Sequence, residues 1–330
     1  YESGLIVAPD NSSDFGVEVL LGTEFADTFN GAFQLELVQG LGGDDLFIGQ
    51  IDFGRLDGGS GFDRIDYREI LFSTEEPQGL DIDLISTLVQ EKAPRFPNGE
   101  PGLPLGSERF EFVEAIEHVI GSLFDDTFIG NGSQNVFTGS KGVDSYDGKS
   151  GRDTVDFSFE RGGFAVTVDL SAGTATDTFG NVETLVSIEN AVGTDRNDRL
   201  TAGAEGSRLD GGLGADTLIG SEESDVFVAR GGNSANRNVI TGFDGNDQLI
   251  LMQGFAQFDA GEGIDTVDLS HLIRGVSFTL SPSATLNGPR QIVRQFDQQT
   301  VVDRLAATSQ PIAELQGVEN AIGTRFNDFL

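Results

Sequence analysis

Apolar residues recur along this chain with a period of nine, separated by stretches rich in glycine and aspartate. Written in nines from Gly22, the sequence reads GTEFADTFN, GAFQLELVQ, GLGGDDLFI, GQIDFGRLD and GGSGFDRID without a gap. Similar runs begin at Gly121 and Gly193, and the latter resumes at Asn233 after an insertion of four residues. A fixed period of this kind indicates a repeat architecture, in which each unit stacks on its neighbours.

The eighth position of the unit tests this register, because it is apolar or aromatic in all 17 complete units. These residues are Phe29, Val38, Phe47, Leu56, Ile65, Phe128, Phe137, Tyr146, Val155, Leu200, Leu209, Leu218, Phe227, Ile240, Leu249, Phe258 and Val267. The last three residues of a unit predict a short strand that buries the eighth side chain, since strand side chains alternate between faces. The first six predict a turn, where glycine at the first, second and fourth positions permits torsions that other residues resist.

Two units form one coil of 18 residues with a strand on each side, and coils stack at the strand spacing of about 4.8 Å. The pattern therefore predicts an all-β fold: a parallel β-roll or β-helix solenoid of Gly- and Asp-rich nonapeptide repeats. Three arrays are joined by non-repeat strands and insertions. The expected segments are an N-terminal segment 1–21, array 22–66, linking strands with a Pro-rich insertion 67–120, array 121–156, linking strands 157–192, array 193–268, linking strands with an insertion 269–322, and the start of a truncated fourth array 323–330.

The linking segments also repeat. GLDIDL at Gly79, GFAVTVDL at Gly163 and GVSFTL at Gly275 precede VEAIEHVIG, LVSIENAVG and LQGVENAIG respectively, so one superrepeat is used three times. Two insertions, residues 75–109 and 281–311, are expected to cover the roll or fill loop space rather than recognise a partner. Because the chain begins at Tyr1 and ends in mid-repeat, we expect it to be a portion of a longer protein.

Composition adds a strong charge signal. The chain has 54 Asp and Glu against 20 Lys and Arg, a net charge of −34, and no cysteine. Such a chain repels itself unless cations neutralise it, although halophily or disorder would give the same composition. The charge argues against nucleic acid or an anionic membrane as partner. No apolar run approaches the roughly 18 residues of a membrane span.

The units GGSGFDRID at residues 58–66 and GGLGADTLI at residues 211–219 resemble the RTX, or hemolysin-type, calcium-binding repeat. The resemblance implies calcium held by the sixth-position aspartates of two successive loops on one edge, together with loop carbonyls. Sixth-position side chains on one edge come close together, and Ca²⁺ with its roughly six to eight oxygen ligands would relieve their repulsion. The alternative is that each aspartate only caps its own turn, but columns above buried apolar positions favour calcium.

The sixth-position residues predicted to hold calcium are Asp27, Asp45, Asp63, Asp126, Asn135, Asp144, Asp153, Asp198, Asp216, Asp225, Asp247, Asp265 and, at the start of a further column, Asp328. Adjacent Asp–Asp pairs predict about six Ca²⁺ sites, and the pairing of Asn135 with Asp153 is expected to be weaker.

The columns are expected to end or lapse where the sixth position changes. Glu36 and Gly54 predict no calcium on the opposite edge of the first array. In the third array one column should end at Asn238 and Ala256, and the other should start only after Ser207. Of the expected calcium pairs, Asp225–Asp247 is the one whose loops have an insertion, residues 229–232, between them in sequence.

Catalytic signatures are not found in the sequence. It has no H-E-x-x-H zinc motif, no G-x-S-x-G elbow and only two histidines, His118 and His271. The prediction is therefore that the chain is not an enzyme, and that His118 has a surface or turn role.

These features predict a non-catalytic calcium-binding segment of a secreted or cell-surface protein with a structural or adhesive role, folded by calcium outside the cell. The RTX resemblance implies type I secretion from a Gram-negative bacterium. Besides calcium, the expected partners are other surface proteins, polysaccharide or copies of the chain. Two alternatives stay open. One is the calcium-binding, secretion-related portion of an extracellular enzyme (protease, lipase or polysaccharide-modifying) whose catalytic domain lies outside this chain. The other is a surface-layer or filament subunit.

Overall fold

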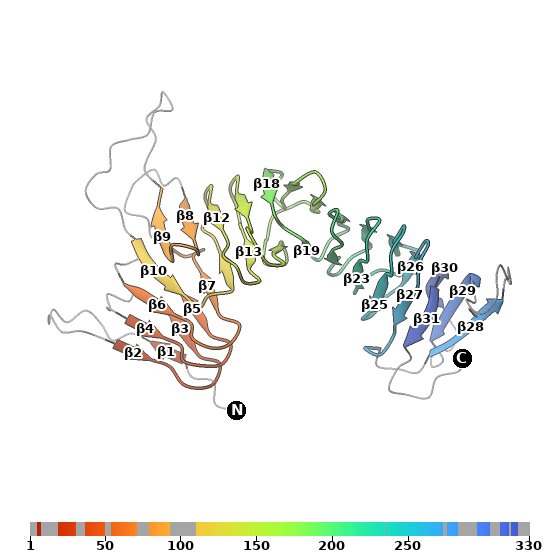
Figure 1. Ribbon diagram of the computed structural model, residues 1–330, viewed down its shortest axis with the longest axis horizontal. Helices are drawn as coiled ribbons and strands as arrows, with labels where there is room; N and C mark the ends of the chain where they lie inside the picture. The colour runs from red at the N-terminus through yellow and green to blue at the C-terminus, as the bar shows by residue number, and fades with distance from the viewer. Residues whose placement is uncertain are drawn as a thin grey trace, which may run out of the picture. The chain divides into compact units, whose positions relative to one another are not determined.

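The computed structural model describes the backbone of residues 5–7, 19–30, 37–49, 54–70, 79–92, 110–233, 235–272, 276–282, 296–303, 311–316 and 318–322. Across these ranges every helix or strand assigned is a β-strand, and parallel sheets form a β-solenoid (Figure 1). The predicted all-β fold class is confirmed. The chain divides into two compact units, residues 1–162 with 181–188, and residues 163–180 with 189–330.

Each unit has two sheets, called here sheet A and sheet B. In the first unit, sheet A contains, in spatial order, β1 (Leu5–Val7), β3 (Thr28–Asn30), β5 (Leu46–Ile48), β7 (Arg64–Asp66), β11 (His118–Ile120), β13 (Val136–Thr138) and β15 (Thr154–Asp156), all parallel. Sheet B contains β2 (Val19–Leu21), β4 (Leu37–Gln39), β6 (Arg55–Asp57), β10 (Phe110–Glu114), β9 (Leu88–Glu91), β8 (Leu80–Asp83), β12 (Thr127–Ile129), β14 (Ser145–Asp147) and β18 (Val182–Val186).

The second unit repeats this plan. Its sheet A contains β19 (Asn190–Val192), β21 (Arg208–Asp210), β23 (Val226–Ala229), β25 (Gln248–Leu251), β27 (Asp265–Asp268) and β31 (Val318–Ile322). Its sheet B contains β17 (Thr174–Thr176), β16 (Thr167–Asp169), β20 (Arg199–Thr201), β22 (Thr217–Ile219), β24 (Asn238–Thr241), β26 (Ala256–Asp259), β30 (Pro311–Gln316), β29 (Phe296–Asp303) and β28 (Val276–Pro282).

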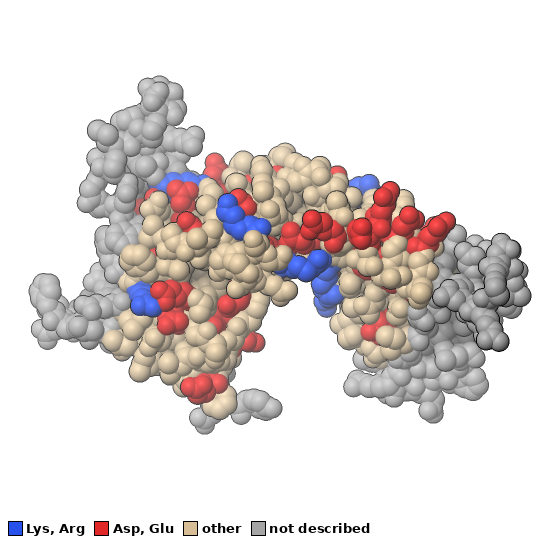
Figure 2. Space-filling model, in the orientation of Figure 1, with Lys and Arg blue, Asp and Glu red and all other residues tan. Residues whose placement is uncertain are grey.

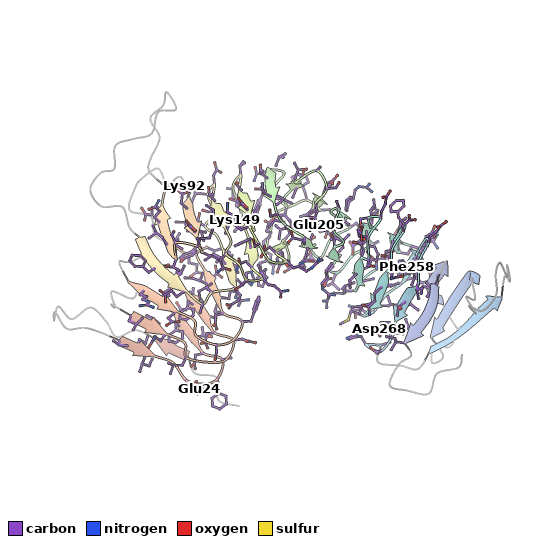
Figure 3. All side chains as sticks on the ribbon, viewed as in Figure 1. Glu24, Lys92, Lys149, Glu205, Phe258 and Asp268 are labelled. Carbon is purple, nitrogen blue, oxygen red and sulfur yellow. The ribbon has the colours of Figure 1, made fainter. Side chains whose placement is uncertain are left out.

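The core lies between the two sheets and is lined by the eighth-position residues. All 17 of them are at most 7% exposed. Parallel pairing sets Phe29 opposite Phe47, 18 residues later, and their rings stack with centroids 4.8 Å apart. Phe128 and Tyr146 stack in the same way at 4.9 Å. The ring separation equals the usual distance between strands, so each coil adds one layer to an apolar ladder. In the second unit the buried eighth-position residues include Phe258, which is labelled in Figure 3.

The linking segments depart from the purely parallel roll. In the first unit, β8 and β9 form an antiparallel hairpin, and β10 pairs antiparallel with β9 and parallel with β6. In the second unit, β16 pairs antiparallel with β17, and β29 pairs antiparallel with both β28 and β30. A tight turn such as that between β8 and β9 can only join antiparallel strands. Each linking segment thus adds strands to sheet B, and the 18-residue coils before and after it are preserved.

His118 lies at the start of β11 and is only 5% exposed. Its Nε2 lies 3.3 Å from the Thr138 hydroxyl, and its ring meets Phe159 edge-on at 5.6 Å. Burial, with a contribution from the nearby Arg64 guanidinium, lowers the pKa of His118 to about 3. The expectation of a surface position is wrong, because the side chain of Phe159 packs over this part of sheet A.

Candidate metal centres

The sixth-position side chains form columns along the edges of the roll. In the first array the Asp27 N–H donates to Asp45 Oδ1, and the Asp45 N–H donates to Asp63 Oδ1, both at 2.8 Å. All three side chains are at most 2% exposed. The period of 18 residues therefore brings successive carboxylates on one edge into direct register.

The other predicted pairs have the same geometry. In each pair the backbone N–H of the first residue donates to Oδ1 of the second, at distances of 2.7 to 2.9 Å. These pairs are Asp126 with Asp144, Asn135 with Asp153, Asp198 with Asp216, Asp225 with Asp247, and Asp247 with Asp265. Every one of these side chains is at most 3% exposed. Glu36 and Asp328 lie outside the described residues.

The Asp225–Asp247 pair is as regular as the others, at 2.8 Å across 22 residues. Residues 230–232, within the insertion, follow β23 and precede β24, on the edge where strands pass from sheet A to sheet B. Asp225 and Asp247 lie on the opposite edge, in loops that lead into β23 and β25. The insertion therefore does not separate Asp225 from Asp247, because proximity in sequence does not place it on the same edge.

The ladder of hydrogen bonds includes the residues at which the calcium columns are expected to end or begin. The Asp216 N–H donates to Asn238 Oδ1 at 2.8 Å, so the ladder of hydrogen bonds extends to Asn238. The Ser207 N–H likewise donates to Asp225 Oδ1 at 2.6 Å, and Ser207 Oγ accepts from the Gly203 N–H. Serine and asparagine thus continue the ladder, although neither supplies a carboxylate.

The loops fall into two classes. In the first class, which opens columns, the sixth-position carboxylate caps its own loop: Asp27 Oδ2 accepts the Thr23 N–H at 2.6 Å, and Asp126 Oδ2 accepts the Ser122 N–H at 2.6 Å. Loops at residues 193–198 and 220–225 have the same bond. In these loops the sixth-position aspartate does cap its own turn, as the alternative to calcium binding expects.

In the second class, called here left-handed loops, both the second and the fourth residue have positive φ. The residue pairs are Leu41 with Gly43, Gly59 with Gly61, Ser140 with Gly142, Lys149 with Gly151, Gly212 with Gly214, Phe243 with Gly245, and Gly261 with Gly263. Four of the second positions are not glycine, which costs about 1–2 kcal/mol each. In four of these loops Oδ2 of the sixth-position aspartate has no partner: the Oδ2 atoms of Asp45, Asp63, Asp216 and Asp247 are buried and accept no hydrogen bond.

The first-position glycines Gly40 and Gly242 are required for space and not for backbone torsion. Neither Gly40 nor Gly242 has positive φ, which corrects the expectation for this position. A Cβ added to Gly40 would lie less than 3.0 Å from Asp45 Oδ2 and from the Gly58 carbonyl oxygen. A carboxylate oxygen and a carbonyl oxygen of the next coil therefore converge beside this glycine. Two acceptors with no donor between them form a place for a cation.

The electrostatics favour the same conclusion. Burial raises the pKa of Asp45 and Asp63 to about 6, that of Asp247 to about 7 and that of Asp216 to about 8. The preceding aspartate in each column adds to the rise by charge repulsion. Negative charge is therefore costly at these positions unless a cation compensates it.

Backbone oxygens must take part in any such site. In the part of the chain that the structure describes, no three His, Cys, Asp or Glu side chains gather closely enough to hold a metal ion. A pair of carboxylates with loop carbonyls fits Ca²⁺, a hard cation that binds oxygen in variable geometry. It does not fit zinc, which prefers histidine and cysteine.

Fifth-position residues form a second ladder that the sequence analysis missed. Asp44 Oδ1 accepts the Phe62 N–H at 2.9 Å, and Asp125 Oδ1 accepts the Val143 N–H at 2.8 Å. Asn197 and Asn246 do the same in the third array. The dipeptide Asp-Asp or Asn-Asp at the end of these loops could have indicated this ladder in the sequence. Both residues of the dipeptide then hydrogen-bond to the next coil on the same edge.

Comparison with known families agrees with this geometry. The family model described as RTX calcium-binding nonapeptide repeat (4 copies) matches residues 120–155, 192–233 and 234–255. The chain contains RTX calcium-binding repeats. A search of curated protein sequences finds no match. The array at residues 22–66 lies outside the matched segments, yet its loops carry the same aspartate column and left-handed residues as the matched RTX repeats.

Proposed function

We propose that this chain is a calcium-binding, non-catalytic segment of a secreted protein and that calcium drives its folding. The observation that carries the proposal is the set of buried Oδ2 atoms without a hydrogen-bond donor, at Asp45, Asp63, Asp216 and Asp247. Each lies in a left-handed loop, and RTX repeats bind calcium. In the arrays at residues 22–66, 121–156 and 193–268, calcium would supply the missing positive charge.

The loop classes suggest one calcium site for each left-handed loop. Each site lies between the sixth-position residue of that loop and the sixth-position residue of the preceding loop on the same edge. The seven resulting pairs are Asp27–Asp45, Asp45–Asp63, Asp126–Asp144, Asn135–Asp153, Asp198–Asp216, Asp225–Asp247 and Asp247–Asp265. The Asn135–Asp153 pair has a single carboxylate and should bind calcium most weakly, because ligand charge sets affinity.

Folding would be coupled to binding because the charges cannot be buried alone. The chain carries a net charge of −34, and Figure 2 shows acidic side chains outnumbering basic ones on the face in view. Without calcium, repulsion between the columns would oppose the coil, and the binding energy becomes folding energy. Secretion by a Gram-negative cell suits this behaviour, since RTX proteins are typically exported and then meet calcium outside.

A structural or adhesive role at the cell surface is the proposed biological use. Nearly all strands of both units belong to the stacked coils or to hairpins added to sheet B, as expected for a rigid spacer. Other surface proteins, polysaccharide or further copies of the chain are the proposed partners. Within the described residues, no helix has the length and apolar character needed to cross a membrane.

Calcium titration followed by far-ultraviolet circular dichroism tests the proposal. The calcium-free chain is expected to be largely unstructured and to gain β-structure cooperatively as calcium is added, with reversal by EGTA. Magnesium is the matched control and should have little effect, because it requires stricter octahedral geometry. Full β-structure in the absence of calcium, unchanged on its addition, would contradict the proposal.

A further inference from the structure

A short turn closes the first array. It comprises residues 115–117 and joins β10, which ends at Glu114, to β11, which begins at His118. A nonapeptide crosses the same edge with six residues, Gly58 to Asp63, between β6 and β7. The turn belongs to the linking segment and not to the repeat, so the sequence period does not mark it as a metal loop.

The first residue of this turn, Ala115, takes the place of a first-position glycine. In the repeat, the Gly40 N–H donates to the Asp57 carbonyl, one residue before Gly58, at 2.8 Å. At the closing turn, the Gly58 N–H donates in the same way to the carbonyl of Glu114, one residue before Ala115, at 3.0 Å.

The last residue, Glu117, takes the place of a sixth-position aspartate. In the repeat, the Arg64 N–H, which follows Asp63, donates to the Asp45 carbonyl at 2.8 Å. At the closing turn, the His118 N–H, which follows Glu117, donates to the Asp63 carbonyl at 3.0 Å. The Asp63 N–H then donates to Glu117 Oε2 at 2.9 Å, as Asp45 does to Asp63. Glutamate is one methylene longer than aspartate, which suits a turn that is three residues shorter.

Oxygen atoms converge here as they do inside the array. A Cβ added to Gly58 would lie less than 3.0 Å from Asp63 Oδ2 and from the Ala115 carbonyl oxygen. Asp63 is fully buried and its Oδ2 accepts no hydrogen bond. The closing turn therefore reproduces the pair of oxygens found beside Gly40, and the unpartnered Oδ2 points to a ligand that supplies positive charge.

The backbone of the turn is held in a strained conformation. Ala115 has φ of 49°, in the left-handed region that non-glycine residues avoid. The turn after β18 repeats it: Ser187 has φ of 50°, and its carbonyl oxygen would lie less than 3.0 Å from a Cβ added to Gly148. The residues there, Ser-Ile-Glu at 187–189, match Ala-Ile-Glu at 115–117. Strain that recurs at equivalent places marks a functional geometry.

We propose that Glu117 and the Ala115 carbonyl complete an additional calcium site with Asp63, which closes the first array. The inference rests on the proposed calcium binding of the repeats and extends it to a residue outside them. Such a site would tie the linking segment to the last coil, so that the array is terminated by a metal and not by an open column.

The test is a count of bound calcium in the whole chain carrying Glu117→Gln, measured by ion analysis after equilibrium dialysis in saturating calcium. The variant is expected to bind one ion fewer than the wild type. Glu114→Gln is the matched control in the same segment, because Glu114 forms an ion pair with Arg55 and lies outside the column; its count should equal that of the wild type. Asp63→Asn should lose two ions.

An unchanged count in Glu117→Gln, with a loss in Asp45→Asn, would overturn the closing site and leave the proposed function standing. Absence of bound calcium in the wild type would overturn the proposed function itself. Long-wavelength anomalous scattering from wild-type crystals gives an answer independent of any variant. An ion bonded to both Asp63 and Glu117 is expected, and ions at the repeat pairs without one here would refute the inference.

Discussion

The first-position glycines of the aspartate edges share their space with oxygen atoms. Beside Gly40 these are Asp45 Oδ2 and the Gly58 carbonyl oxygen, and beside Gly242 they are Asp247 Oδ2 and the Ala260 carbonyl oxygen. A methyl group at either glycine would displace the oxygens that a cation needs. Glycine is therefore demanded here by ligand geometry, whereas at the second and fourth positions it is favoured by torsion.

Gly40→Ala should weaken calcium binding in the first array and destabilise the calcium-loaded fold by about 1–3 kcal/mol, since the added methyl overpacks a buried site. Gly49→Ala is the matched control: Gly49 is also a first-position glycine, but its added Cβ would meet no described atom within 4 Å. Isothermal calorimetry and thermal melts in calcium measure both. Equal losses in the two variants would show that the clash beside Gly40 is not the cause.

At the scale of the element, the six-residue loop and the three-residue strand have separate sequence requirements. The strand is specified by its buried eighth residue, while the loop is specified by two left-handed positions. Where the second residue of the loop is Leu41, Ser140, Lys149 or Phe243, the loop holds an unfavourable torsion. Strain of this kind persists only when the surrounding hydrogen bonds and ligands fix the backbone.

Lys149→Gly should raise the unfolding free energy of the calcium-loaded protein by about 0.5–1 kcal/mol, because glycine relieves the φ of 66° at this exposed position. The substitution also removes a solvent-exposed ion pair between Lys149 and Asp147, but such pairs contribute little to stability. Lys141→Gly, at the third position of the neighbouring loop where φ is not positive, should instead lower stability. Urea unfolding of the two variants decides between these signs.

At the scale of the whole molecule, charge and folding are linked through pH. Burial raises the pKa of Asp216 from 3.8 to about 8 and that of Asp247 to about 7 in the folded chain without metal. Because the folded state holds these protons more tightly than the unfolded state, their contribution to stability is fully present below about pH 4. It is lost progressively as pH rises from about 4 through the folded pKa values of about 7 and about 8.

Without calcium, the chain should therefore show more β-structure at pH 5 than at pH 8. Apparent calcium affinity should change in the opposite direction, falling as pH drops from 8 to 6, because protons compete for the same carboxylates. Circular dichroism in EGTA across this range, with calcium titrations at each pH, measures both trends. A calcium-free fold that strengthens with rising pH would contradict the burial of these groups.

The period of nine was enough to predict the strands of the nonapeptides, the eighth-position core and the aspartate columns. All three follow from local spacing, because a constant coil of 18 residues brings equal positions together. Sequence could not predict the antiparallel hairpin β8–β9, since it depends on which strands of the linking segment pair.

Only the tertiary structure distinguishes aspartates that cap their own loop, such as Asp27, from those that keep an unpartnered oxygen, such as Asp45. It alone aligns Glu117 with the column, although Glu117 lies 54 residues after Asp63 and outside the nonapeptides. The physical reason is that a metal site depends on where oxygen atoms meet in space, and a nonlocal turn can supply them as well as a repeat.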